Sequence, residues 1–158
     1  MIKGDAHKMH RIYLLAFILI LSACGVPSQS NLATPDDKKE EKTIQQLVVD
    51  NENVKITVLN MNKSNSTVTI TFDILNKRED SIKIKAEQLS VDDRMVDESI
   101  YQLEDEILPH KAANVKLIIQ QKEGVDFPEF KNDIEMELYI SSLKDPSYVE
   151  QHLVNIIY

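Results

Sequence analysis

The stretch Thr67-Val68-Thr69-Ile70-Thr71-Phe72-Asp73-Ile74 decides the fold class of this chain, because a large apolar residue occupies every second position. Side chains alternate between the two faces of a β-strand, so the four apolar residues would line one face and the polar ones the other. Threonine is β-branched and suits the half-exposed face of a sheet. The stretch therefore predicts a strand that buries Val68, Ile70, Phe72 and Ile74 and turns Thr69 and Thr71 toward solvent.

The same two-residue period recurs on both sides of this strand. The apolar positions that alternate with polar ones are Val54, Ile56 and Val58, then Ile82 and Ile84, then Ala113, Val115, Leu117 and Ile119, and finally Ile134, Met136, Leu138 and Ile140. Polar turn residues separate these stretches at 50–53, 62–66, 76–80 and 92–94. A last strand is expected within residues 152–158, and residues 101–106 could form one helical turn. The pattern predicts an all-β, antiparallel β-sandwich of about seven to nine strands, with neighbouring strands connected as a meander.

An export signal precedes the strands. Lys3, Lys8 and Arg11 are followed by an apolar run that ends in Leu21-Ser22-Ala23-Cys24. Spanning a membrane takes about 20 apolar residues, and this run is shorter. The last four residues resemble the lipobox of bacterial prolipoproteins. This resemblance implies that the thiol of Cys24 receives diacylglycerol, that residues 1–23 are removed, and that the lipid holds the protein to the extracytoplasmic face of the cell membrane. An ordinary secretory signal and an uncleaved anchor are the alternatives.

Composition divides the remaining chain into two parts. Residues 24–42 contain prolines, serines and charges with almost no large apolar side chain, so a flexible tether is expected there. Residues 43–158 would form one sandwich domain, the size of which suits a single core. Removing residues 1–23 leaves 15 basic and 25 acidic residues, a net charge of 15 − 25 = −10. Such a chain is repelled by nucleic acid, which excludes a nucleic-acid partner.

Two segments carry a further resemblance. The strand of residues 68–74 is followed by Asn76-Lys77, and Leu108-Pro109-His110-Lys111 leads into the strand of residues 113–119. These features resemble the immunoglobulin-like domains of small Gram-positive surface lipoproteins, over roughly residues 43–158. The resemblance implies an immunoglobulin-like sandwich. His110 occupies a corner position at which that family commonly has glycine.

Few residues point to chemistry. Seven carboxylates between Asp92 and Glu106 could supply calcium ligands, but no EF-hand spacing or turn glycine accompanies them. His110 and His152 are isolated, and Cys24 is the only cysteine. We therefore expect no catalytic residue, metal or cofactor. Phe127 and Phe130 flank a loop that would either cap the sandwich or form a partner-binding site.

These observations favour a non-enzymatic, lipid-anchored surface module that binds a protein or a cell-envelope component. Its membrane contact would be the lipid on Cys24. An accessory subunit of a surface enzyme, or such an enzyme itself, is one alternative, and a small solute-binding lipoprotein is another. The last class normally needs two lobes, for which residues 43–158 are too few.

Overall fold

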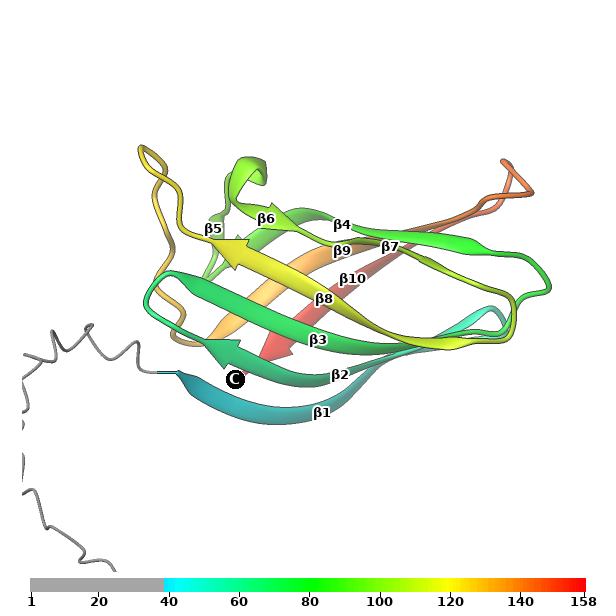
Figure 1. The fold of residues 1–158 in the computed structure, drawn as a ribbon, viewed down its shortest axis with the longest axis horizontal. Helices are drawn as coiled ribbons and strands as arrows, with labels where there is room; N and C mark the ends of the chain where they lie inside the picture. The colour runs from blue at the N-terminus through cyan, green and yellow to red at the C-terminus, as the bar shows by residue number, and fades with distance from the viewer. Residues whose placement is uncertain (1–38) are drawn as a thin grey trace, which may run out of the picture. The chain divides into compact units, whose positions relative to one another are not determined.

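The computed structural model describes residues 39–158, which form two antiparallel sheets packed face to face (Figure 1). The first sheet has the order β1-β2-β3-β8-β6. Its strands are β1 (Glu40–Asp50), β2 (Val54–Lys63), β3 (Thr67–Asn76), β6 (Tyr101–Gln102) and β8 (Ala112–Gln120). The second sheet has the order β10-β9-β4-β5, and β7 also pairs with β4. Its strands are β4 (Ile82–Val91), β5 (Arg94–Met95), β7 (Glu104–Ile107), β9 (Asp133–Ser142) and β10 (Val149–Ile157).

The predicted all-β antiparallel sandwich is confirmed. Seven strands are nine residues or longer, and the short β5, β6 and β7 bring the total in the described residues to ten. β2, β3 and β8 occupy the places of immunoglobulin strands A, B and E, and β4, β9 and β10 those of C, F and G. The expected meander is wrong after β3, because the chain crosses between the two sheets at residues 77–81 and again before β6, β7, β8 and β9. Turn composition marks a chain reversal but does not say which sheet the next strand joins.

The core contains the residues that the alternation predicted. Val68, Ile70, Phe72 and Ile74 have no exposed surface, and the apolar positions that the alternation predicted in β2, β4, β8 and β9 are buried except for the half-buried Ala113. In β10, Val154 and Ile156 face inward. Thr69 and Thr71 are half-buried rather than open to solvent, because β3 lies between β2 and β8. The described residues contain no cysteine, so burial of apolar surface is the main source of their stability.

The helical turn lies earlier than expected. A 3-10 turn spans Glu98–Ile100, and the Asp97 carboxylate caps it by accepting a hydrogen bond from the Ser99 N–H at 2.8 Å. Residues 101–107 are extended instead. β6 pairs with β8 in the first sheet and β7 pairs with β4 in the second, so the chain changes sheets around the buried Leu103. Each strand is too short to show an alternating pattern.

The first strand begins before the expected start of the domain. β1 starts at Glu40 and pairs with β2 from that residue onward, three residues before position 43. Charged, exposed residues of an edge strand carry no apolar alternation, so the sequence did not reveal them. A bulge at Gln45, with φ of 56°, interrupts the pairing. Cys24, the signal segment and residues 24–38 of the expected tether lie outside the described residues.

The corner before β8 contains a strained histidine. The Lys111 N–H donates to the Leu108 carbonyl at 3.2 Å, and His110 has φ of 55° in the third position of this turn. A positive φ there is typical of a type II turn and favours glycine. We expect His110→Gly to raise the free energy of unfolding by about 0.5–1 kcal/mol, because the strain outweighs the entropy that glycine adds to the unfolded chain.

Urea unfolding checks this prediction, with His110→Ala as the matched control. Both variants lose the contact between His110 and Glu79, which is exposed and contributes little. Only the glycine variant also relieves the backbone strain caused by the positive φ at position 110. Equal stabilities of the two variants would contradict the prediction.

Candidate binding surface

Four loops meet at one end of the sandwich, opposite the end at which β1 begins (Figure 1). We call this surface the loop end; it consists of residues 51–53, 77–81, 108–111 and 143–148. The backbone joins these loops directly. The Lys77 N–H donates to the Asn53 carbonyl at 2.8 Å, and the Leu143 N–H donates to the Ser81 carbonyl at 3.0 Å. Loops from both sheets therefore form one connected surface.

Asn76, the last residue of β3, holds two of these loops in place. Its side chain is fully buried, and its amide nitrogen donates to the carbonyls of Asp80, Ile107 and Leu108 at 2.8, 3.0 and 3.1 Å. Its side-chain oxygen accepts from the Arg78 N–H at 3.0 Å. A buried polar side chain is tolerated when its donors and acceptors are satisfied in this way. The asparagine that ends the strand thus fixes the loops before β4 and before β8.

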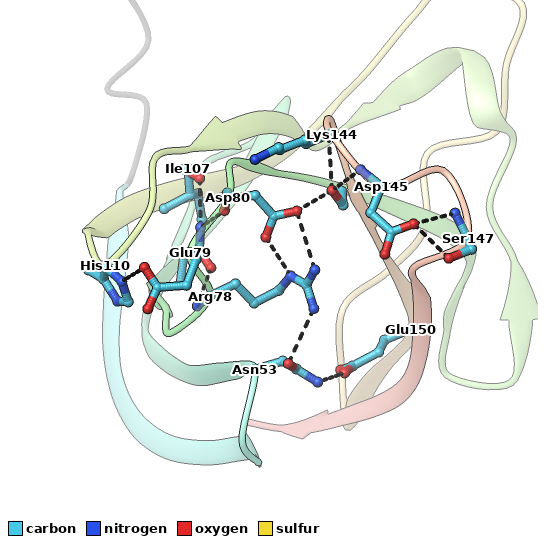
Figure 2. Close-up of polar contacts among 12 residues, drawn as sticks. Asn53, Arg78, Glu79, Asp80, Ile107, His110, Lys144, Asp145, Ser147 and Glu150 are labelled. Carbon is cyan, nitrogen blue, oxygen red and sulfur yellow. Dashed lines mark hydrogen bonds and ion pairs between the residues drawn. The ribbon is translucent and has the colours of Figure 1, made fainter.

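An ion pair within the second loop lies against the fourth loop (Figure 2). The Arg78 guanidinium donates to both carboxylate oxygens of Asp80, at 2.8 and 3.2 Å, and the Ser142 hydroxyl donates to Asp80 as well. The guanidinium, together with this hydroxyl, lowers the pKa of Asp80. The guanidinium carbon also lies 3.6 Å from the centre of the Tyr148 ring. Arg78 is therefore held on two sides, as expected for a planar cation that both pairs and stacks.

Glu150 connects the first loop to the last strand. Its carboxylate accepts hydrogen bonds from the side-chain amides of Asn51 and Asn53, at 2.9 and 2.6 Å, and lies 2.9 Å from Nε2 of His152. Burial by itself would raise the pKa of Glu150, but these hydrogen bonds outweigh burial and lower it. The carboxylate is thus engaged in positioning the loop.

Several polar side chains of the loop end pair with one another, and two apolar side chains are exposed beside them. Leu108 is 57% exposed and Leu143 is 53% exposed, on loops that the Asn76 and Arg78 contacts hold in place. Binding residues are often carried on loops positioned by a rigid scaffold. Within residues 39–158, no group of three or more histidine, cysteine or acidic side chains is arranged to hold a metal ion. The arrangement suits recognition of a partner more than chemistry.

The acidic residues considered for calcium lie in different elements: Glu104, Asp105 and Glu106 belong to β7, and Asp92, Asp93 and Asp97 belong to turns at the opposite end. Asp92 and Asp93 have φ of 48° and 62° and form the two-residue turn between β4 and β5, in the geometry of a type I′ hairpin. The Asp92 carboxylate accepts hydrogen bonds from the backbone N–H groups of Lys131, Asn132 and Asp133, at 2.8 to 3.2 Å. This carboxylate ties the turn to the start of β9.

This contact predicts a loss of stability in acid. Burial alone would raise the pKa of Asp92, but the three backbone hydrogen bonds lower it below the ordinary 3.8. A group with a lowered folded-state pKa stabilises the fold above its unfolded pKa, and this contribution is lost as the pH falls through the folded value. We expect Asp92→Asn to be less stable than the parent at pH 7, with a difference that shrinks below about pH 4.

Urea unfolding at pH 7, 5 and 3 measures this effect. Asparagine tolerates the positive φ, so the substitution tests the charge rather than the backbone. The neighbouring Asp93→Asn is the control and should give a difference that changes little with pH. A constant deficit of Asp92→Asn across this range would argue against the role of the charge.

The aromatic loop folds back on the sandwich. Phe130 is 6% exposed and belongs to the core, while Phe127 is half-buried, and the two ring centres are 5.6 Å apart. This loop was expected either to cap the sandwich or to form a partner-binding site. Phe130 caps the sandwich, because its ring is buried as part of the core. Phe127 also lines a depression of about 600 Å³, together with Met95, Pro128 and Arg94.

Sequence reasoning recognised Asn76 and the corner of His110 but missed Arg78, Tyr148 and Glu150. The composition around Arg78 predicts a polar turn, and no sequence pattern indicates a contact between residues 78 and 148. The Leu143 and Leu108 side chains were also missed. Single apolar residues in loops give no periodic signal.

No family model matches this sequence, and no curated protein matches it. Among solved structures, a FixG-related protein from Vibrio parahaemolyticus is similar, with a TM-score of 0.38 and 11% sequence identity. The match covers 69% of this chain and 97% of that one. The described residues contain no helix that is long and apolar enough to cross a membrane.

Proposed function

We propose that the protein is a lipid-anchored, non-enzymatic module that presents its loop end to a protein or cell-envelope component outside the cytoplasmic membrane. Support for the anchor comes from the lipobox-like order that ends at Cys24. The chain enters the sandwich at Glu40, at the end away from the loop end (Figure 1). An anchor that precedes β1 would therefore join the sandwich at the end opposite the loop end. Fifteen residues, 25 to 39, separate Cys24 from β1. Even a fully extended chain of this length spans at most about 50 Å.

The observation that carries the binding role is the exposure of Leu108 and Leu143 on loops that hydrogen bonds from the buried Asn76 side chain and from the backbone hold in place. Such loops do not have to be ordered when a partner binds, so little conformational entropy is lost. The net charge of −10 that remains after signal removal is repelled by anionic lipid headgroups, and this repulsion favours a position of the domain away from the membrane surface. We assign no catalytic residue. Glu150 and His152 contact each other, but the Glu150 carboxylate already accepts hydrogen bonds from two side-chain amides that belong to the fold.

Site-specific photo-crosslinking in bacterial membranes tests this role. A photoreactive residue at Leu143 of the full chain should give a discrete adduct with an envelope component. The same residue at Ile118, which is 40% exposed on the outer face of β8, is the matched control and should not. Replacing Leu108 by Ser should weaken the Leu143 adduct. Absence of any adduct at Leu143, or equal adducts at both positions, would contradict the proposal.

A further inference from the structure

The last strand, β10, is an edge strand of its sheet. It pairs with β9 over nine consecutive residues without a register shift, and no other strand of residues 39–158 continues the sheet beyond it. β1 of the other sheet touches β10 and reaches it through the Gln46 side chain, but it does not pair with β10 as a strand. Proteins usually protect such edges with charges, bulges or short strands. The facing edge strand β1 has such protection, with Glu40, Glu41, Lys42 and a bulge at Gln45.

The outward side chains of β10 carry no charge. These residues alternate with the inward-facing ones and are Val149, Gln151, Leu153, Asn155 and Ile157. Leu153 is 80% exposed and Ile157 is 74% exposed. Large apolar side chains at such exposure, repeated along one strand, are typical of a surface that another protein covers. The acidic side chains beside this face belong to β9, where Asp133 and Glu135 both accept hydrogen bonds from the Asn155 side chain.

The backbone of the same five residues is directed to the free edge. In an antiparallel pair, each residue turns its N–H and C=O groups together, alternately toward and away from the partner strand. Tyr148 and Tyr158 direct backbone groups toward the β9 side, where they pair with Ser142 and Asn132. The Asn155 carbonyl instead accepts a hydrogen bond from the Gln46 side chain at 2.8 Å, on the other side of the strand. Odd-numbered residues of β10 therefore present their backbone groups at the open edge.

From this edge we infer that β10 pairs antiparallel with β10 of a second copy, with Leu153 opposite its own counterpart. A two-fold axis at Leu153 places Val149 opposite Ile157 and Gln151 opposite Asn155. Apolar side chains then face apolar ones, amides face amides, and edge-directed backbone groups meet edge-directed ones. Cross-strand pairs of this kind are the unit of sheet stabilisation.

Other registers are less favourable. A slide of two residues in either direction places apolar side chains opposite amides along the strand. A slide of four restores apolar pairs but shortens the overlap and leaves one apolar residue unpaired. The sequence of β10 thus selects one register. Formation of this pair requires that the Gln46 side chain releases the Asn155 carbonyl, which then accepts from the backbone N–H of the second strand. It also requires that β1, which contacts β10, leaves room for that strand.

Two nine-residue edges make a narrow interface, so the pair is expected to form where copies are concentrated, as in a membrane. This inference uses a surface different from the loop end. It therefore stands or fails separately from the proposed binding role.

Cysteine crosslinking of the full chain in bacterial membranes tests the register. Residues opposite each other in a hydrogen-bonded pair have Cα atoms about 5.5 Å apart, within the range that a disulfide accepts. Leu153→Cys should give a disulfide-linked dimer under mild oxidation. Val149→Cys and Ile157→Cys should each fail alone, because eight residues separate the identical positions, and should form a dimer when both variants are co-expressed. The parent, with Cys24 alone, gives the background.

Leu47→Cys on β1, which is 55% exposed, is the matched control and should yield at least ~10-fold less dimer. Adding Leu153→Lys should abolish the dimer between Val149→Cys and Ile157→Cys, because two like charges then face each other. A Leu153→Cys dimer no more abundant than that of Leu47→Cys would overturn the inference. Dimers from Val149→Cys alone, or a Leu153→Cys adduct with a different protein, would also overturn it.

Discussion

Phe72→Ala is expected to lower the free energy of unfolding by about 3–5 kcal/mol. The Phe72 side chain is fully buried near the middle of β3, and β3 is flanked by β2 and β8. Truncation removes most of the apolar surface of the side chain from the core and leaves a cavity, because packed strands on both sides limit collapse.

Urea unfolding followed by circular dichroism measures this loss. Thr69→Ala on the opposite face of the same strand is the matched control. Thr69 is half-buried, so its replacement should cost about 1 kcal/mol or less, within the range of β-propensity effects. Similar losses at positions 72 and 69 would mean that the two faces of β3 are wrongly assigned.

Asn76→Asp is expected to have an effect of similar size, about 3–5 kcal/mol at pH 7. The substitution preserves shape but replaces the amide nitrogen that donates to three backbone carbonyls. A buried carboxylate would then face carbonyl oxygens, leaving those acceptors unsatisfied and its own charge unpaired. The loops before β4 and before β8 should both loosen.

The pH dependence distinguishes this mechanism from a simple loss of packing. Burial without a cation raises the pKa of a carboxyl group, and its protonated form can again donate one hydrogen bond. The deficit relative to the parent should therefore shrink as the pH is lowered from 7 to 4. Gln120→Glu, on the exposed face of β8 and opposite Thr67, is the control and should stay within about 0.5 kcal/mol. A deficit independent of pH would argue against the buried charge.

Side-chain alternation was sufficient to predict the long strands and their buried faces. Val68, Ile70, Phe72 and Ile74 each occupy the face that the period of two assigns to them. The alternation failed where a strand is short or charged. Residues 101–107 change sheets within a few positions, and Glu40 to Lys42 form an edge that needs no apolar residue. Such segments are specified by long-range pairing, which no local pattern records.

The loop end was predicted less well than the core. Asn76 stood out because it follows a strand, but its three carbonyl partners come from two other segments. The contact of Arg78 with Tyr148 joins residues seventy positions apart, 148 − 78 = 70. The open edge of β10 was also not predicted, since His152 to Tyr158 did not show which face is inward. In the structure Val154 and Ile156 are buried in the core, and Leu153 and Ile157 are exposed on the opposite face.

The lipid anchor is the central claim of this account, because the display of the loop end outside the membrane and the crowding of β10 edges both depend on it. The most direct measurement is the intact mass and N-terminal residue of the protein extracted from bacterial membranes. The account predicts a chain that begins at Cys24 and carries diacylglycerol on its thiol, and a Cys24→Ala variant without the lipid. A membrane-bound chain that retains residues 1–23, or one that begins elsewhere and has no lipid, would contradict it.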